Sequence, residues 1–568
     1  MENPVSADER LSRPTGLGWL LWVVAASLPW LLPTHSDPWT TIYSELLMAA
    51  VLLASLGWAI WASKRGWPVS RLVLVLVGGA AIPLGQSIAG LLIFPGEAVL
   101  QAACVWAFAC AVSLGQRAQL CEPYRLIDSL FASLVFAAVL STGLALYQWF
   151  GLGGAGVLLP SIEVGGGRAV GHVGQANNLS TLLVWGCVGL WWAVCRRSIG
   201  GSIAALVIAF LLVGLVLTGS RTGCVQAAFL AVMVLFLGRS QFLFYRVLTV
   251  AVLGGWLVGL LAALPIVSEL LFGTTSREML SVGLRPKFWS MAIEALLDRP
   301  LAGYGWNQVV TVHVALSDRY SGLGAIMGHA HNIVLDLLLW NGVVLGGGVI
   351  LGAIWWGGSQ LCKVVTEAHG IILAALGVFL IHALLELPHL YAFFYLPVGV
   401  MVGVASTFVP WRAVTLLPQG YVAFTAIVLA ALLAMMFRDY RLIETDLMAH
   451  RMVAARIAGA AIPESPKVVV LGFLQGALEQ LRTEPRRDMG DEELEQLRRT
   501  ILRYPTTGGL FRYAQSAALN HRQEEARWAL QIVCSLKSAE ECAAVVTDWK
   551  TLALEGNPEM NAVSLPPQ

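Results

Sequence analysis

Charged residues are scarce in this chain. Asp, Glu, Lys and Arg make up 12% of the 568 residues, whereas 57% are hydrophobic and 21 are tryptophan. Soluble domains carry about 25% charged residues, so the composition excludes a soluble globular protein. The net charge of +1 indicates no partner by itself, and we expect no nucleic acid to bind.

The cysteines lack the spacing of metal ligands. Seven of the nine lie in or beside apolar runs, where a cysteine is usually a small packing residue. Cys534 and Cys542 differ because they lie in the charged C-terminal region. An oxidising compartment would permit a disulfide between them if the geometry allows it.

Long apolar runs are abundant. A membrane crossing needs about 20 mostly apolar residues, and thirteen runs of this kind recur. The first follows a charged segment and is not followed by a small-residue cleavage site, so it is expected to remain as a helix. The predicted spans are 17–33, 43–62, 72–93, 97–115, 127–150, 179–195, 202–218, 222–238, 247–268, 332–357, 369–386, 390–409 and 420–437. The predicted fold class is an all-α polytopic membrane protein with about 12–13 transmembrane helices and a small helical extramembrane domain.

Arginine and lysine placement predicts the topology. Cationic residues gather in alternate loops, which favours a cytoplasmic location for those loops and for the N-terminus. They are Lys64, Arg65, Arg71, Arg117, Arg125, Arg196, Arg197, Arg239, Arg246, Lys363 and Arg412. An odd number of spans then places the C-terminus outside. We therefore predict a transmembrane domain, 1–437, with long outward loops at 151–180 and 269–330, and an exported helical domain, 438–568.

The C-terminal region has helical patterning with many charges. Alanine and leucine recur at helical spacing, which predicts an all-helical domain. The stretch "LNHRQEEARWAL" is similar to the turn and second helix of a tetratricopeptide-like hairpin, although no full 34-residue repeat can be demonstrated.

Three arginines are candidates for binding an anion. Arg221 lies between two apolar helices, Arg285 lies in the long loop 269–330 one helical turn before Trp289, and Arg168 lies in a glycine-rich loop. A guanidinium flanked on both sides by membrane helices usually marks a substrate path, and arginines converging from separate loops offer planar donors that suit phosphate or pyrophosphate. The alternatives are a snorkelling role for Arg221 and a plain surface charge for Arg168.

The stretch "MGHAHNIVLDLLLWNG" places polar residues at the start of an apolar run. Asn332 can cap the helix that follows, and His331 can take a proton near neutral pH. His329 and His331 have no third metal ligand at a recognisable spacing, so no metal site is predicted. Asp336 lies on the same helix face as Asn332 and either orients the cap or a histidine, or packs in the bundle interior.

These motifs together resemble a known family. "TGSRTG", "RPKFW", "GYGWN" (303–307) and "HAHNIVLDLLLWNG" resemble the O-antigen ligase and polymerase superfamily. "GHVGQANNLSTLL" (171–183), "HALLELPHLYAFFYLP" (382–397) and "PTHSDPWTTIYSE" (33–45) are similar to bacterial protein O-oligosaccharyltransferases that glycosylate pilins. The "GQPN" of that subgroup reads "GQAN" here.

The resemblance implies a glycosyltransferase C-like enzyme of the bacterial inner membrane, with its active site facing the periplasm. It implies inverting, metal-independent transfer of a glycan en bloc from undecaprenyl pyrophosphate to an acceptor hydroxyl, without a cofactor. Arg221 and Arg285 match the arginines of the family, and His331 matches its essential histidine. The other candidates for binding substrate are Arg168, Gln175, Asn177, Asn178, Trp289, Tyr304, His329, Asn332, Asp336, Glu386 and Tyr391.

The acceptor separates the possible functions. A protein O-oligosaccharyltransferase would glycosylate Ser or Thr of a protein such as a pilin, whereas an O-antigen ligase would glycosylate lipid A core. A chain polymerase of the same superfamily is a third possibility. A transporter or flippase would predict inverted repeats and broken helices across two halves, and no such repeats are found in the sequence.

Overall fold

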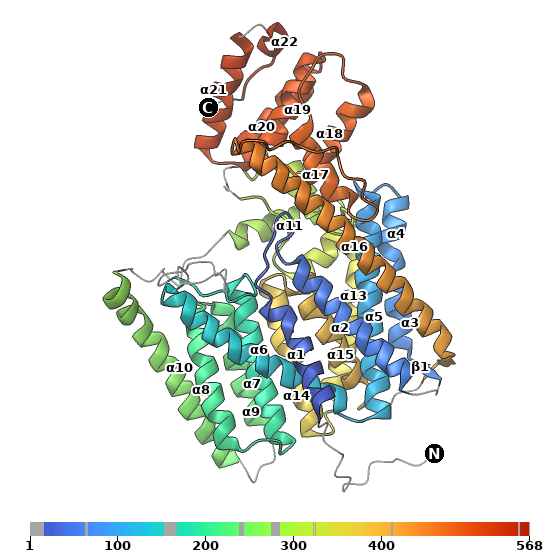
Figure 1. Cartoon of the computed structure of the whole chain (residues 1–568), viewed down its shortest axis with the longest axis vertical. Coiled ribbons are helices and arrows are strands. Elements are labelled where there is room, and N and C mark those ends of the chain that lie inside the picture. Colours follow the sequence, from blue (N-terminus) through green and yellow to red (C-terminus); the bar gives the residue numbers. More distant parts are fainter. Residues whose placement is uncertain are drawn as a thin grey trace. The chain divides into compact units, whose positions relative to one another are not determined.

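The computed structural model describes residues 16–62, 66–152, 167–237, 243–273, 284–321, 323, 325–409, 413–554 and 557–566. Most of these residues are helical (Figure 1). Two short strands, β1 (Trp67–Val69) and β2 (Thr415–Leu417), pair antiparallel, with Pro68 opposite Leu416. Within loop 151–180, the described residues are 151–152 and 167–180.

Each predicted span coincides with apolar helix in the structure. Nine stretches are long and apolar enough to cross a membrane, counted over the described residues, and four of the predicted spans are shorter helices of 15 or 17 residues. The long stretches are α2 (Ile42–Trp61), α3 (Arg71–Gly79) with α4 (Ala81–Ile88), α5 (Pro95–Cys121), α6 (Arg125–Trp149), α7 (Ala176–Cys195), α10 (Leu243–Phe272), α13 (Ile333–Leu361), α14 (Glu367–Leu385) and α16 (Gln419–Ala454). The shorter ones are α1 (Leu17–Leu31), α8 (Gly201–Leu217), α9 (Arg221–Leu237) and α15 (Ala392–Ser406). The predicted all-α polytopic fold is confirmed, and the chain is a multi-pass membrane protein.

The described chain forms two compact units. The first combines residues 1–77, 105–280 and 356–433, and the second combines 78–104, 281–355 and 434–568. Several helices therefore contribute to both units. The predicted division of the chain at residue 437 stays a prediction about its domains.

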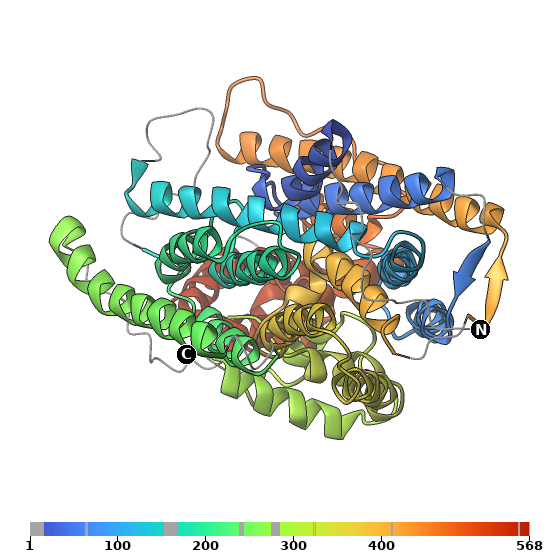
Figure 2. The same cartoon turned by 90° about the horizontal axis from the view of Figure 1, so that it is seen from below.

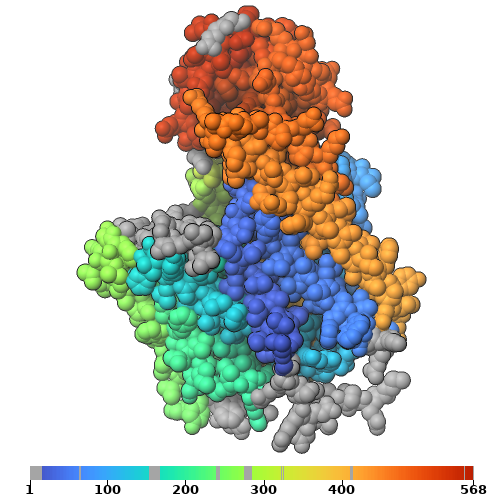
Figure 3. All heavy atoms as spheres, viewed as in Figure 1, coloured from blue at the N-terminus to red at the C-terminus, as the bar shows by residue number. Residues whose placement is uncertain are grey.

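Helix α7 is the centre of the first unit. It contacts α6, α8, α9 and α14, and most of its side chains are buried. Several helices of this unit are seen nearly end-on in Figure 2, and α1 and α2, which contact each other, lie side by side in Figure 3. Because α7 is surrounded, polar residues in its first turn are withdrawn from lipid and must find partners within the protein.

Helix α13 of the second unit is broken at Gly342. This glycine has φ 69° and ψ 178°, which is not helical. A Cβ at this position would lie 2.0 Å from the Leu301 carbonyl oxygen, so only glycine fits. The break frees carbonyl groups in the preceding turn: Leu339 O accepts from Tyr304 N over 2.7 Å, and Trp340 O accepts from Gln86 Nε2 over 2.8 Å. The single helix predicted for 332–357 is thus two helical segments.

The loop 269–330 and the C-terminal region supply the other helices of the second unit. The loop contributes α11 (Arg285–Asp298) and α12 (Val309–Ala315). The C-terminal helices are α17 (Gly472–Arg482), α18 (Asp491–Arg503), α19 (Thr507–Leu519), α20 (Gln523–Leu536), α21 (Ala539–Leu554) and α22 (Pro558–Asn561). Helices α19 and α20 contact each other and form the predicted helical hairpin.

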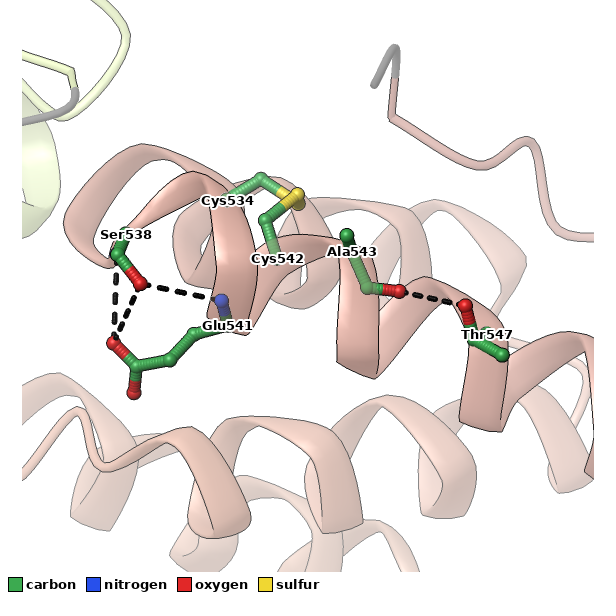
Figure 4. The surroundings of a disulfide bond; sticks show 6 residues. All are labelled: Cys534, Ser538, Glu541, Cys542, Ala543 and Thr547. Atoms are coloured by element: carbon green, nitrogen blue, oxygen red, sulfur yellow. Dashed lines mark hydrogen bonds between the residues drawn. A yellow bond between two sulfur atoms is a disulfide. The ribbon is translucent and has the colours of Figure 1, made fainter.

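A disulfide joins Cys534 of α20 to Cys542 of α21, with their Cα atoms 4.6 Å apart (Figure 4). Ser538 lies between the two cysteines, and its Oγ accepts from the Glu541 backbone N–H over 3.2 Å. The bridge and this capping contact fix the turn between the two helices.

Candidate active site

In the second unit the His331 turn is held by its neighbours. His331 has φ 52°, a left-handed conformation that is uncommon outside glycine. Asp336, which is fully buried, accepts from the Ala330 backbone N–H through Oδ1 over 2.8 Å. Asn332 Oδ1 accepts from the backbone N–H groups of Val334 and Leu335 over 3.0 and 3.3 Å. Asn332 is therefore the predicted cap of α13, and Asp336 orients the residue before His331.

Helix α11 is attached to the same turn. The Trp289 indole Nε1 donates to the Ala330 carbonyl oxygen over 2.9 Å. Arg285 is the first residue of α11 and lies one turn before Trp289. The hydrogen bond thus joins the helix of Arg285 to Ala330, the residue that precedes His331. The side chains of His329 and His331 are both half-buried.

The "GYGWN" motif packs against the break in α13. Gly303 has φ 66°, and a Cβ there would lie 2.4 Å from the Leu339 carbonyl oxygen. Tyr304 is buried, and the Arg299 guanidinium lies 4.8 Å from the centre of its ring. Burial raises the pKa of the Tyr304 hydroxyl. The ring of Trp306 stacks on that of Trp340, and its backbone N–H donates to Gln86 Oε1. The motif has an evident packing role, while substrate binding by Tyr304 stays a prediction.

In the first unit, the predicted amides lie at the N-terminus of α7 and divide into two kinds. Asn177 is fully engaged: its Oδ1 accepts from Ser220 Oγ over 2.7 Å, and its Nδ2 donates to Glu386 Oε1 over 2.9 Å. Asn178 is hydrogen-bonded to Tyr391, but its buried Oδ1, like Gln175 Oε1, has no donor within the described chain. A buried acceptor without a donor costs about 1–3 kcal/mol. Gln175 and Asn178 therefore retain the capacity to accept from a hydroxyl-bearing ligand.

Arg168 contacts the turn between α8 and α9, and Arg221 follows that turn as the first residue of α9. The Arg168 Nε donates to the Thr218 carbonyl oxygen over 2.8 Å, and its Nη2 lies 3.4 Å from Asn177 Oδ1. Ser220 Oγ accepts from the Gly223 backbone N–H over 3.0 Å and so caps α9, whose first residue is Arg221. Both arginines are exposed. Exposed arginines at and beside the N-terminal end of a helix are suited to binding an anion.

Comparison with known proteins finds two family matches and two similar proteins. Residues 204–350 match the family described as O-Antigen ligase, and residues 371–548 match the family described as Virulence factor membrane-bound polymerase, C-terminal. The General O-oligosaccharyltransferase of Acinetobacter baylyi (strain ATCC 33305 / BD413 / ADP1) is 29% identical over 526 residues, which are 89% of this chain and 90% of that protein. The ComP-specific O-oligosaccharyltransferase of the same strain is 24% identical over 246 residues, which are 42% of this chain and 44% of that protein.

Two segments of the chain thus match families described as an O-antigen ligase and a membrane-bound polymerase, and most of its length is similar to an O-oligosaccharyltransferase. These similarities support a glycosyltransferase-type membrane enzyme. The match to the O-antigen ligase family contains Arg221, Arg285, His329, His331, Asn332 and Asp336. The match to the polymerase family contains Glu386 and Tyr391.

Sequence reasoning missed two polar groups of the first unit. Glu45 is buried in the first turn of α2, and its Oε1 accepts from Trp39 Nε1 and Thr41 Oγ1 over 2.9 and 2.5 Å. His35 lies against Gly174. Burial, and secondarily the nearby His35, lower the pKa of the His172 imidazole. The similarity of 33–45 to the family pointed to this segment, but no local pattern indicated its partners.

Proposed function

We propose that this enzyme transfers a preassembled glycan from undecaprenyl pyrophosphate to a hydroxyl group of a protein, at Ser or Thr. The observation that carries the proposal is the hydrogen bond from Trp289 to Ala330, because it joins the helix of Arg285 to the turn of His331. An arginine that can bind an anion and a histidine that can act as a base are thus held by connected segments. This arrangement suits a reaction in which a pyrophosphate leaves while a hydroxyl group attacks.

The reaction is a single displacement at the anomeric carbon. The acceptor oxygen forms a bond to this carbon as the bond to the pyrophosphate oxygen breaks, which inverts the configuration. The hydroxyl proton passes to the His331 imidazole, and the electron pair leaves with the pyrophosphate. Fixed guanidinium groups stabilise the charge that develops on the leaving group, and Arg285 and Arg221 are assigned that role.

The unengaged acceptors fit the sugar end of this reaction. Gln175 Oε1 and Asn178 Oδ1 can each accept from a sugar hydroxyl, whereas Asn177 is already bonded to Ser220 and Glu386. We therefore assign glycan contact to Gln175 and Asn178, and a structural role to Asn177.

The proposed acceptor is a protein because the General O-oligosaccharyltransferase is similar over most of the chain. A second candidate is lipid A core, since residues 204–350 match the family described as O-Antigen ligase. Purified enzyme with undecaprenyl-pyrophosphate-linked glycan should be offered a pilin-like protein and lipid A core separately. Glycosylated protein is the expected product. Glycosylation of lipid A core alone would replace the first assignment with the second.

The proposed location is the bacterial inner membrane, with the His331 turn and the C-terminal helices in the periplasm. The distribution of arginine and lysine over alternate loops supports this orientation. A reporter that is active only after export, fused after Gln568, should be active. A fusion at the same place to a reporter active only in the cytoplasm should be silent, and the reverse result would overturn the orientation.

A further inference from the structure

Helix α12 packs in the core of the C-terminal helices. Val310 and Val314 of α12 belong to the same buried hydrophobic cluster as Leu494, Leu497 and Ile501 of α18, and the two helices are in contact. All these residues lie within the second compact unit. A helix of the loop that precedes His331 is thus part of the C-terminal hydrophobic core.

A buried carboxylate lies beside this junction. Glu97, in the first turn of α5, is 1% exposed. Its Oε1 accepts from Arg503 Nε, at the end of α18, over 2.7 Å. Its Oε2 accepts from Gln308 Nε2, immediately before α12, over 2.6 Å. Burial opposes the charge on Arg503, but Glu97 raises the pKa of this guanidinium overall. Glu97 therefore ties the start of α12 to the end of α18.

Helix α12 in turn contacts both candidate catalytic elements of this unit. His313 Nδ1 accepts from the Met327 backbone N–H over 2.9 Å, four residues before His331. The ring of Phe288, on α11 with Arg285, contacts the His313 ring edge-on. His313 and Met327 are both fully buried. A displacement of α12 would therefore move the His331 turn and α11 together.

We propose that Glu97 is a positioning residue. Its hydrogen bonds with Arg503 and Gln308 form a clamp that holds α12 in place. Through His313 and Phe288, α12 then fixes the positions of His331 and Arg285. This inference rests on the proposed function of His331 and Arg285. It gives the C-terminal helices a part in the catalytic step. A domain that only recruits the acceptor would affect acceptor binding instead.

The kinetic test compares Arg503→Gln and Glu97→Gln with Arg499→Gln. Arg499 lies on the same helix, is 61% exposed and pairs with Glu495, so its replacement is the matched control. Loss of the clamp should lower kcat by about tenfold to a hundredfold, as expected for a misplaced catalytic group, with the acceptor KM unchanged. Arg503→Lys should retain an intermediate kcat because it keeps the charge but loses the guanidinium geometry. A raised acceptor KM with normal kcat would overturn the proposal.

Removing one member of a buried ion pair leaves the other uncompensated. The double variant Glu97→Gln with Arg503→Gln removes both charges and is the better-folding test. Hydrogen exchange of residues 326–335 gives a readout that needs no substrate: exchange should quicken in this double variant and stay normal in Arg499→Gln. Unchanged exchange with normal kcat would refute the positioning role. If the wild-type enzyme transferred no lipid-linked glycan, the proposed function would fail, while the exchange result would still test the clamp.

Discussion

Asp336, in the first turn of α13, accepts a hydrogen bond through its carboxylate from the backbone N–H of Ala330 over 2.8 Å. The bond spans the cap residue Asn332 and fixes the peptide before His331. A carboxylate with this task need not be charged, because an amide oxygen can accept the same bond.

Asp336→Asn is therefore expected to retain much more transferase activity than Asp336→Ala. The alanine variant leaves the Ala330 N–H without its acceptor and should lower kcat by about tenfold to a hundredfold through misplacement of His331. Both variants should be assayed with purified enzyme at matched expression. Equal loss in the two variants would instead indicate that the negative charge itself is required.

His331 is expected to be essential for transfer, whereas His329→Ala should keep substantial activity. General-base assistance contributes about 10²–10⁴-fold, so His331→Ala should lose activity on that scale while still binding lipid-linked glycan. His331→Asn is the sharper test because asparagine tolerates the left-handed backbone found here, φ 52°. Near-normal turnover of a well-expressed His331→Asn enzyme would rule out the assigned role.

The local features of this fold were predictable, because each depends on neighbouring residues. The apolar runs predicted thirteen spans, and an apolar helix, or in one case the pair α3 and α4, lies at each of them. Asn332 was recognisable as a cap from its place before the run. The hydrogen bond that Arg503 donates to Glu97 joins residues 406 positions apart, and no periodicity signals such a pairing. The same reason explains why His35 and Glu45 were missed as neighbours of the amide cluster. Gly342 was visible as a motif residue, but its role depends on the approach of Leu301, which only the fold brings near.

Arg221 and Arg285 are expected to stabilise the leaving pyrophosphate. Replacement of either by Ala should abolish detectable transfer, and Lys should restore it only in part because the ammonium lacks the paired donors of arginine. Arg299→Ala is a useful comparison, since this arginine lies over the Tyr304 ring. Activity that disappears with EDTA and returns with a divalent cation would argue for metal assistance instead.

Gly342→Ala is expected to disrupt the second unit. The new Cβ would lie 2.0 Å from the Leu301 carbonyl oxygen and would require φ 69°, and the backbone strain alone costs about 1–3 kcal/mol. Gly347→Ala, in the same helix, has no atom within 4 Å of its new Cβ and serves as the control. Thermal unfolding in detergent should show a lower Tm for Gly342→Ala and an unchanged or higher Tm for Gly347→Ala. Similar Tm values for the two would contradict the broken-helix geometry.

The stability of the second unit should fall as the pH falls from about 6.5 to 4. Burial lowers the pKa of His313 from 6.5 to about 4, so between these values the unfolded chain takes up a proton that the folded chain does not. Above pH 6.5 both states are neutral at this residue and it contributes no pH dependence. Below about pH 4 His313 is protonated in both the folded and the unfolded state. The loss of unfolding free energy is then complete and is on the order of 3 kcal/mol at most.

His313→Asn isolates this contribution because asparagine can still accept from the Met327 N–H but does not titrate. The difference in unfolding free energy between the wild type and His313→Asn should therefore change over this pH range and stay constant above it. Chemical unfolding of the two proteins at pH 7.5, 6.5, 5.5 and 4.5, followed by tryptophan fluorescence, measures the difference. A constant difference at all four pH values would mean that His313 takes up its proton equally in both states, and that the buried contact with Met327 does not exclude the charged imidazole.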